Sequence, residues 1–241
     1  MNTVAIVQAR MTSSRLPGKV LKEVMGKPLI EYLIERLRRV KHLSNIVIAT
    51  TVNDSDQSIV ELCDKLGVDC FRGSEEDVLS RYYKAALHYR AEHIVRITSD
   101  CPVIDPEVVD QVISYYFGQK SDYTSNGLVR SFPRGLDTEV FSFKVLEEAH
   151  QEAKESFERE HVTPFLYNNR DRFSTHNYSY KYDCSYHRWT VDTQEDFILI
   201  QKIIEALYNK KSNFTLEDCL ELLEQNPEWI NLNAHVEQKR Y

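Results

Sequence analysis

Short apolar runs alternate with longer amphipathic segments through the first half of the chain. The apolar runs predict strands that are buried on both faces of a sheet, at 3–8, 45–50, 68–71 and 93–99. The segments after them have apolar residues three or four positions apart and predict helices, at 28–40, 54–66, 75–90 and 105–117. This order predicts an α/β sandwich in which helices cover a mainly parallel sheet.

The second half of the chain has a less regular pattern. Strands are predicted at 122–127, at 138–143, within the tyrosine-rich run that ends at 187, and over HRWTVD at 187–192. Helices are predicted at 143–154, 156–168, 194–208 and 215–225. Because no long linker or internal repeat interrupts the pattern, we expect residues 1–241 to form one domain whose C-terminal part, about 194–241, is helical.

Residues at the ends of two predicted helices are typical of caps. Asp54 or Ser55 can cap the helix at 54–66, and Gly67 can end it. Asp192 or Thr193 can cap the helix that starts at 194.

Composition and charge exclude several classes of protein. The 241 residues are 42% hydrophobic and 28% charged, which is ordinary for a folded domain, and the net charge of -7 disfavours general nucleic-acid binding. No apolar run approaches the roughly 20 residues that cross a bilayer, and the N-terminus lacks the order of a signal peptide, so we expect a cytoplasmic protein without a membrane anchor. The five cysteines form no CxxC pair, which disfavours a zinc site or a disulfide framework.

A cluster of positive charge follows the first predicted strand of this acidic chain. The stretch VQARMTSSRLPGK places Arg10, Arg15 and Lys19 within ten residues, with Ala9 and Ser14 among the small residues between them. Small side chains let phosphate approach backbone N–H groups, while arginine and lysine supply charge. The stretch is neither GxGxxG nor GxxxxGK[ST], so dinucleotide binding and ordinary P-loop chemistry are disfavoured. A solvated basic loop is the alternative.

Two aspartates follow predicted strands. Asp100 comes after the strand at 93–99 and shortly before Pro102, and Asp192 ends the strand predicted at 187–192. Taken singly, each aspartate is as typical of a turn or a helix cap as of a metal ligand. Since ligands of open α/β sheets bind at the carboxyl ends of the strands, the two carboxylates beside a cationic loop together predict a site for Mg²⁺ and a nucleoside triphosphate.

At this point several segments resemble a known family. AIVQARMTSSRLPGKVL resembles the N-terminal signature of the sugar-acid cytidylyltransferases, the group that includes CMP-Kdo and CMP-sialate synthetases. Other segments resemble the SpsF-type branch, which is named for spore coat polysaccharide biosynthesis: RGSEEDVLSRY, ITSDCPVIDPEVVD, FPRGLDTEVFSFKVLEEA, REHVTPFLYNN and RWTVDTQEDF. The matches run in order from residue 4 to about 200, and the part beyond 210 carries none.

The resemblance implies a Rossmann-like α/β sandwich of the nucleotide-diphospho-sugar transferase type, with CTP as donor and Mg²⁺ as cofactor. It implies that Arg10 and Lys19 contact the triphosphate, with Arg15 as a helper. It also implies that Asp100 and Asp192 hold the metal. The segment that approaches the cytidine in the family contains, in this chain, Arg72, Gly73 and Ser80. Many relatives have glycine where this chain has Ser99. The serine side chain narrows the approach to the metal.

The acceptor side is expected in the segment RGLDTEVF. Arg134 can pair with an acceptor carboxylate, and Asp137 or Glu139 with its hydroxyls, while Gly135 lets the backbone approach a ligand. A charged hairpin entry is the alternative for these residues. His161 and Arg188 are further candidates, although EREH is also typical of a solvated helix face and Arg188 can simply stack on the following tryptophan.

The combined prediction is nucleotidyl transfer. A hydroxyl of a sugar acid, such as a nonulosonic acid or Kdo, attacks the α-phosphorus of CTP, and pyrophosphate leaves. Two alternatives stay open: a glycosyltransferase that uses a nucleotide-sugar, and a non-catalytic module that binds one. The cation cluster favours nucleotidyl transfer, because three cations fit a triphosphate better than they fit the diphosphate of a nucleotide-sugar. Relatives of this kind commonly form homodimers, although no residue here marks an interface.

Overall fold

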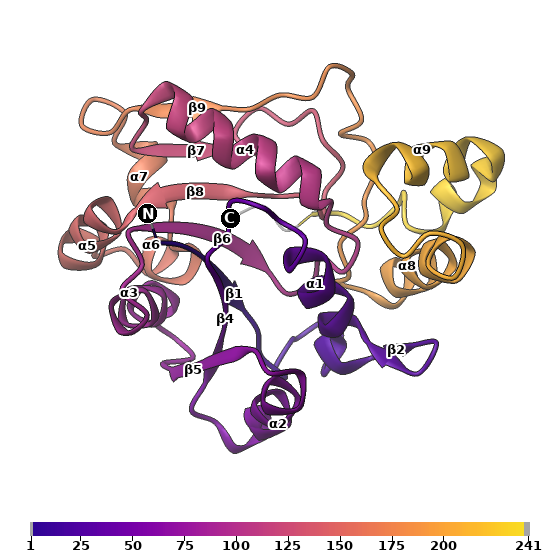
Figure 1. Ribbon diagram of the computed structural model, residues 1–241, viewed down its shortest axis with the longest axis horizontal. Coiled ribbons are helices and arrows are strands. Elements are labelled where there is room, and N and C mark those ends of the chain that lie inside the picture. Colours follow the sequence, from indigo (N-terminus) through magenta and orange to yellow (C-terminus); the bar gives the residue numbers. More distant parts are fainter. Residues whose placement is uncertain (1, 239–241) are drawn as a thin grey trace.

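A seven-stranded sheet forms the centre of the computed structural model, which describes residues 2–238 (Figure 1). The strand order is β5-β4-β1-β6-β8-β7-β9. The parallel half contains β1 (Thr3–Gln8), β4 (Asn45–Thr51), β5 (Asp69–Gly73) and β6 (His93–Thr98). The other half contains β7 (Tyr123–Ser125), β8 (Glu139–Ser142) and β9 (Thr175–Asn177), and β8 runs antiparallel to both of its neighbours. The predicted mixed, mainly parallel sheet is confirmed.

Helices cover both faces of the sheet, as predicted (Figure 1). One face packs against α1, α2, α4, α8 and α9, and the other packs mainly against α3 and α5. The helices have these bounds: α1 Leu29–Leu37, α2 Gln57–Leu66, α3 Val78–His88, α4 Pro106–Gln119, α5 Phe143–Glu152, α6 Ser156–His161, α7 Pro164–Asn168, α8 Gln194–Leu207 and α9 Leu216–Gln225.

Strand β1 shows why an unbroken apolar run was the right signal. Ala5 and Val7 point into the core on one face of the sheet, and Val4 and Ile6 point into the core on the other. All four side chains are fully buried. A strand between two parallel neighbours, covered by helices on both sides, has no polar face, so its sequence does not alternate.

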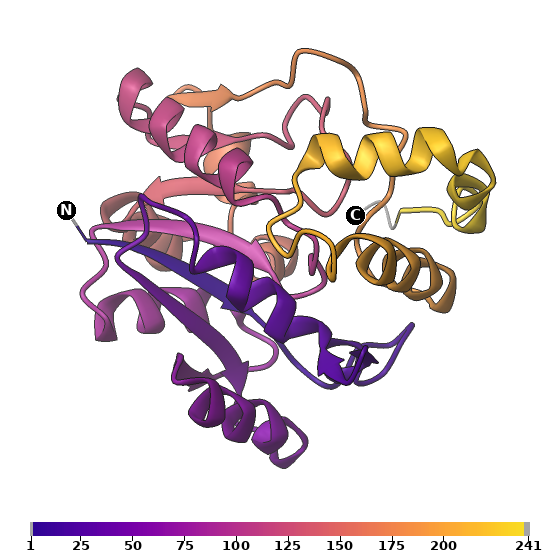
Figure 2. The same cartoon turned by 45° about the vertical axis from the view of Figure 1, so that its right-hand side comes forward.

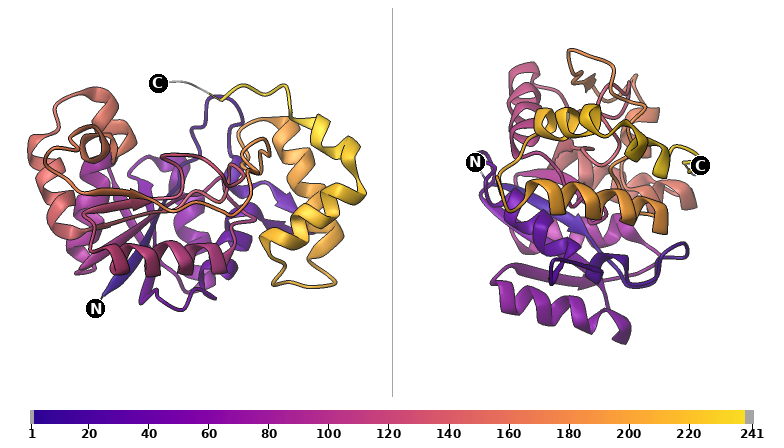
Figure 3. Two further views of the ribbon diagram at one scale, coloured as in Figure 1. Left: turned by 90° about the horizontal axis from the view of Figure 1, so that it is seen from above. Right: turned by 90° about the vertical axis from the view of Figure 1, so that its right-hand side faces the viewer.

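The C-terminal helices lie together at one end of the molecule. Figures 2 and 3 show α8 and α9 side by side there, next to a small hairpin formed by β2 (Glu23–Val24) and β3 (Lys27–Pro28). A 3₁₀ helix, η3 (Pro227–Leu232), packs on both helices. Figure 3 shows the tail after η3 running back toward the sheet. Within the part predicted to be helical, about 194–241, α8, α9 and η3 are present and end at Leu232, and 233–238 form no helix; residues 239–241 lie outside the described residues.

Three predictions about the second half were wrong. The segment 187–192 is no strand, since its backbone N–H groups bond to loops: Trp189 donates to the carbonyl of Arg134 and Val191 to that of Asp100. The tyrosine-rich run contributes only β9 to the sheet. The helix predicted at 156–168 is divided into α6 and α7 by Val162, whose φ is 71°.

Helix caps also differ from one of the predictions. Neither Asp54 nor Ser55 caps α2, because a 3₁₀ turn, η2 (Asp54–Asp56), precedes that helix, while Gly67 does end it in the left-handed conformation. Thr193 caps α8 by accepting a hydrogen bond from the backbone N–H of Asp196 at 3.3 Å. The carboxylate of Asp192 is therefore not used as the cap.

Asp56 is a fully buried carboxylate that ties the loop after β1 to the end of β4. It accepts hydrogen bonds from Met11 N at 2.8 Å, Thr50 Oγ1 at 3.0 Å, Thr51 N at 3.1 Å and Thr51 Oγ1 at 2.6 Å. Burial opposes ionisation, but these hydrogen bonds outweigh it and hold the pKa of Asp56 below its ordinary value. The sequence pattern gave no indication of this role.

We expect Asp56→Asn to lower the free energy of unfolding by about 2–3 kcal/mol, because an amide replaces one accepting oxygen with an NH2 group, which leaves the donors that face it without an acceptor. Urea unfolding at neutral pH measures the change. Asp54→Asn is the matched control, since Asp54 is exposed, and it should stay within about 0.5 kcal/mol of the original protein. The difference between the variants should shrink as the pH falls through the lowered pKa of Asp56, where the carboxylate is protonated. Equal stability of both variants at neutral pH would contradict this role.

Candidate active site

A cavity of about 220 Å³ opens at the carboxyl ends of β1 and β6. The loop after β1 forms one wall, the residues after β6 form another, and the end of α6 and the start of the segment before α8 complete it. Its lining includes many of the predicted residues: Ala9, Arg10, Ser14, Arg15, Lys19, Asp100, His161 and Asp192. The structure therefore brings together side chains from four distant parts of the chain.

The loop after β1 is closed by a backbone hydrogen bond between its two ends. Gly18 N donates to the carbonyl of Met11 at 2.9 Å, and Gly18 has φ 68°, a conformation that favours glycine. A 3₁₀ turn, η1 (Lys19–Leu21), follows immediately. This turn directs Lys19 into the cavity.

Lys19 lies between the two predicted metal ligands. Its Nζ is 2.7 Å from Asp192 Oδ1 and 3.0 Å from Asp100 Oδ2. Burial alone would lower the pKa of Lys19, but the two carboxylates outweigh burial and raise it above its ordinary value. Burial would likewise raise the pKa of Asp100, yet Lys19 and nearby hydrogen bonds hold it below its ordinary value. Both Lys19 and Asp100 are therefore charged at neutral pH.

Asp192 is held by a second layer of buried charge. Its Oδ2 contacts Arg15 at 2.7 Å and Arg188 at 3.0 Å. Arg188 in turn binds Asp196, a fully buried carboxylate, at 2.8 and 3.0 Å. Asp196 also accepts hydrogen bonds from the backbone N–H groups of Asp192 and Thr193, at 3.0 and 3.1 Å. Asp196 was not predicted as a site residue, although it lies in the segment DTQED, residues 192–196, which is part of the resemblance.

The guanidinium of Arg188 binds other residues of the protein and does not face a cavity. Its side chain is 7% exposed and lies behind Asp192. It lines neither the cavity around Lys19 nor the larger cavity beside it, which is described below. The remaining guanidinium nitrogen, NH1, donates to Gln238 in the C-terminal tail at 2.6 Å. Asn233, in the same tail, donates to the carbonyl of Arg188 and to Asp196, both at 2.8 Å. The tail is thus fastened to the residues that support Asp192.

Asp100 and Asp192 have the chemistry of a magnesium site. Carboxylate oxygens are hard ligands, and both groups already share one cation, the ammonium of Lys19. Within residues 2–238 no cluster of three or more His, Cys, Asp or Glu side chains could hold a metal. Two carboxylates with the remaining ligands from phosphate and water is the usual arrangement when Mg²⁺ binds together with a nucleotide.

The residues predicted to approach the cytidine are placed differently from one another. Arg72 turns away from the cavity and donates to the carbonyls of Thr51 and Asn53, at 3.0 and 2.9 Å. Ser80 is buried in the first turn of α3. Gly73 lies against Arg81, since a Cβ there would be 3.0 Å from the Cγ of that arginine.

Arg81 lines the same cavity as Lys19, although the sequence did not predict it as a site residue. Its side chain is almost fully buried and donates to the carbonyl of Ser74. Its Nε is buried and finds no hydrogen-bond acceptor within residues 2–238. Because burial without a carboxylate partner is costly for a guanidinium, Arg81 is a candidate to meet an acceptor group of a bound nucleotide.

A second and larger cavity, of about 1140 Å³, adjoins the first one. Both are lined by His161. The second cavity is rich in arginine, and its lining includes Arg96, Arg130, Arg134, Glu139, Tyr167, Glu237 and Gln238. Arg96 comes from inside β6, where the apolar strand pattern concealed it.

The arginines of this cavity differ in whether they have a partner. Arg96 pairs with Glu139 at 2.9 Å, and Arg130 pairs with Asp137 at 2.5 Å. Arg134 has no ion pair or side-chain hydrogen bond within residues 2–238, and burial lowers its pKa below the ordinary value. Arg134 is therefore available to an anionic ligand.

Gly135 meets the protein's own backbone. Its φ is 102°, and a Cβ there would lie 2.6 Å from the carbonyl carbon of Trp189. This close approach allows the backbone bonds that join 134 to 187 and 189. The glycine thus fixes the position of Arg134.

A strained turn places His161 at the junction of the two cavities. Val162 has φ 71° and ψ -52°, and Thr163 N donates to the carbonyl of His161 at 2.8 Å, which defines a γ-turn. This conformation is unfavourable for a β-branched residue, and Val162 is nevertheless fully buried. The turn ends α6 at His161. Burial lowers the pKa of His161, so its ring is uncharged at neutral pH.

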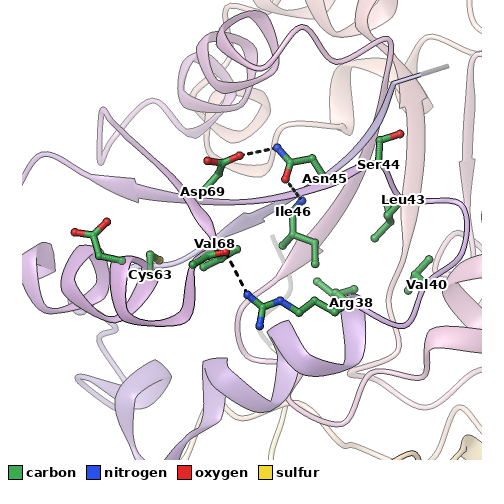
Figure 4. A pocket seen from close by; sticks show the side chains of 12 residues that line it. Arg38, Val40, Leu43, Ser44, Asn45, Ile46, Cys63, Val68 and Asp69 are labelled. Atoms are coloured by element: carbon green, nitrogen blue, oxygen red, sulfur yellow. Dashed lines mark hydrogen bonds between the residues drawn. The ribbon is translucent and has the colours of Figure 1, made fainter.

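Another cavity, of about 490 Å³, lies at the opposite edge of the sheet, beside the starts of β4 and β5 (Figure 4). Its polar groups are used internally: Asn45 donates to Asp69 at 2.7 Å, and Arg38 donates to the carbonyl of Leu66 at 2.5 Å. It contains no cluster of charge like the one around Lys19. The chemistry of the molecule therefore concentrates at the carboxyl edge.

Known proteins resemble the chain along nearly its whole length. The family model described as "Cytidylyltransferase" matches residues 4–240. An uncharacterized protein, MJ1063, from Methanocaldococcus jannaschii is 39% identical, over 100% of this chain and 98% of that protein. The spore coat polysaccharide biosynthesis protein SpsF from Bacillus subtilis is 34% identical, over 92% and 94%.

A solved structure agrees with these similarities. A cytidylyltransferase from Leptospira borgpetersenii superimposes with a TM-score of 0.92 at 32% identity, covering 100% of this chain and 99% of that one. Within residues 2–238, no helix is long and apolar enough to cross a membrane. The match of fold and sequence along the same residues leads to one conclusion: this chain belongs to the cytidylyltransferase family.

Proposed function

We propose that the protein transfers CMP from CTP to a sugar acid, a nonulosonic acid or a Kdo-like acid, with release of pyrophosphate, for the synthesis of a surface or spore-coat polysaccharide. One observation carries the proposal: a cavity with Lys19, Asp100 and Asp192 adjoins a cavity that presents the guanidinium of Arg134, which has no ion pair among residues 2–238. The first suits a triphosphate and a metal ion, and the second suits a carboxylate. Membership of the cytidylyltransferase family favours this reaction over glycosyl transfer.

The nucleotide side works by positioning and charge. Arg10, Arg15 and Lys19 bind the β- and γ-phosphates and stabilise the negative charge that builds up on the departing pyrophosphate. Ala9 and Ser14 leave room for the phosphates to approach the backbone of the loop. Asp100 and Asp192 hold Mg²⁺, which when bound neutralises charge on the α-phosphate.

On the base and ribose side, three residues have supporting roles. Arg81 meets the nucleotide with its unsatisfied Nε. Gly73 leaves space for Arg81, and Arg72 holds the turn after β4 through its bonds to Thr51 and Asn53. Ser80 lies in the first turn of α3, whose N-terminal end borders the cavity at Val78.

The acceptor side orients the attacking hydroxyl. Arg134 binds the acceptor carboxylate, and Asp137 and Glu139 accept hydrogen bonds from its hydroxyls while they remain paired to Arg130 and Arg96. His161, at the junction, contacts the acceptor next to the α-phosphate. Arg188 acts from behind, by keeping Asp192 in position.

The transfer reaction is tested by mixing the protein with CTP, Mg²⁺ and a panel of nonulosonic acids and Kdo, and by measuring pyrophosphate release. We expect release with at least one acid, and Asp100→Asn should lower that rate by at least about 100-fold because the metal loses a ligand. Circular dichroism should show an unchanged fold. Asp64→Asn, on the exposed side of α2, is the control and should keep the full rate. Release from no acid would refute the proposal, and a fully active Asp100→Asn would refute the metal assignment.

The acceptor assignment is tested with Arg134→Ala. Loss of a charged hydrogen bond to the carboxylate should raise the KM for the acid by roughly 10- to 100-fold, while the KM for CTP stays the same. Arg134→Lys should recover part of the loss, because it restores the charge without the planar fork. Arg170→Ala is the control, since Arg170 is exposed and lines neither cavity. An unchanged KM for the acid in Arg134→Ala would show that the carboxylate binds elsewhere.

A further inference from the structure

The ammonium of Lys19 occupies the space that a metal ion would need. It lies 2.7 Å from Asp192 and 3.0 Å from Asp100, and its side chain is only 12% exposed. Mg²⁺ binds oxygen at about 2.0–2.1 Å. A metal ion that bridges these two carboxylates would therefore have to replace the lysine nitrogen.

Three of the four carboxylate oxygens of Asp100 and Asp192 are already in ion pairs. Asp192 uses Oδ1 for Lys19 and Oδ2 for both Arg15 and Arg188, and Asp100 uses Oδ2 for Lys19. The lining of this cavity carries four positive side chains, Arg10, Arg15, Lys19 and Arg81, against three carboxylates, Asp100, Glu160 and Asp192. The local excess of positive charge repels a free divalent cation and attracts a polyanion.

Lys19 has a second set of partners within reach of a small movement. It belongs to the loop that also carries Arg10 and Arg15, and all three side chains line the same cavity. A triphosphate in this cavity offers several negative oxygens to the flexible lysine side chain. When the ammonium turns toward them, Asp100 loses its ion pair and both carboxylates gain a free oxygen for a metal.

We propose that Lys19 is a stand-in cation that keeps Asp100 and Asp192 together in the nucleotide-free protein and excludes the metal until a triphosphate draws the ammonium away. The inference rests on the metal-binding role in the proposed function and adds an order to it. The nucleotide enters before the metal or together with it, and the free protein does not retain a divalent ion. Lys19 is thus a positioning residue for the metal site as well as a phosphate ligand.

The test measures Mn²⁺ binding to the nucleotide-free protein, from the electron paramagnetic resonance signal of unbound Mn²⁺. Lys19→Met should bind Mn²⁺ at least about tenfold more tightly than the original protein, because the competing positive charge is gone. Lys22→Met is the matched control. Lys22 is three residues away, lies 4.8 Å over the ring of Phe197 and makes no ion pair within residues 2–238, so its removal should leave Mn²⁺ affinity unchanged.

A double variant locates the bound ion. Lys19→Met combined with Asp100→Asn should lose the gained affinity, since one of the two ligands is removed. Equal Mn²⁺ affinity of Lys19→Met and the original protein would overturn the proposal, and so would a gain that survives in the double variant. Thermal unfolding confirms that each variant is folded, and Lys19→Gln replaces Lys19→Met if the latter does not fold. The measurement uses neither CTP nor a sugar acid, so a failed transfer assay leaves its result readable.

Discussion

Charges that are removed from water must be paired, and this requirement joins the distant parts of the chain. Lys19, Asp100 and Asp192 come from the loop after β1, the end of β6 and the segment before α8, and each is largely shielded from solvent. The ammonium of Lys19 offsets both carboxylates, and the two carboxylates together offset the cost of burying the ammonium. The same rule extends inward to Arg188 and Asp196. The ion pairs at this edge of the sheet therefore also hold the sheet and the C-terminal helices together.

The sequence predicted the parallel half of the fold well because packing there leaves a simple signal. Strands such as β1 are buried on both faces and read as apolar runs. The segment 187–192 gave the same signal for a different reason: Trp189 and Val191 are fully buried, but their backbone partners are loops. Burial is written in residue type, whereas the identity of a hydrogen-bond partner is not. The break at Val162 had no signal at all, since a valine at positive φ contradicts local preference.

The candidate site could be predicted where it depends on strand ends, and it was missed where it depends on packing. Lys19 and Asp100 were found because the parallel strands β1 and β6 bring their carboxyl ends to one edge. Asp192 was found from a strand at 187–192 that the structure does not contain, and loop contacts bring it to the same cavity. Arg81 and Arg96 read as ordinary members of a helix and a strand, and only the tertiary structure shows that they line cavities. The part beyond 210 carried no motif of the resemblance, although the family model covers it, and Glu237 and Gln238 line the larger cavity. A region without a recognisable motif thus lines the cavity that we propose for the acceptor.

The γ-turn at Val162 stores backbone strain at the junction of the two cavities. A residue with a γ-turn of positive φ typically costs about 1–3 kcal/mol, and glycine would adopt the same angle with far less strain. Glycine would also free the backbone that ends α6 at His161. The chain keeps the rigid, strained residue, which gives the junction one fixed geometry at the expense of the folded state. Stability engineering that relaxes this turn would act directly on the geometry between donor and acceptor, so a thermostable variant is better sought elsewhere in the molecule.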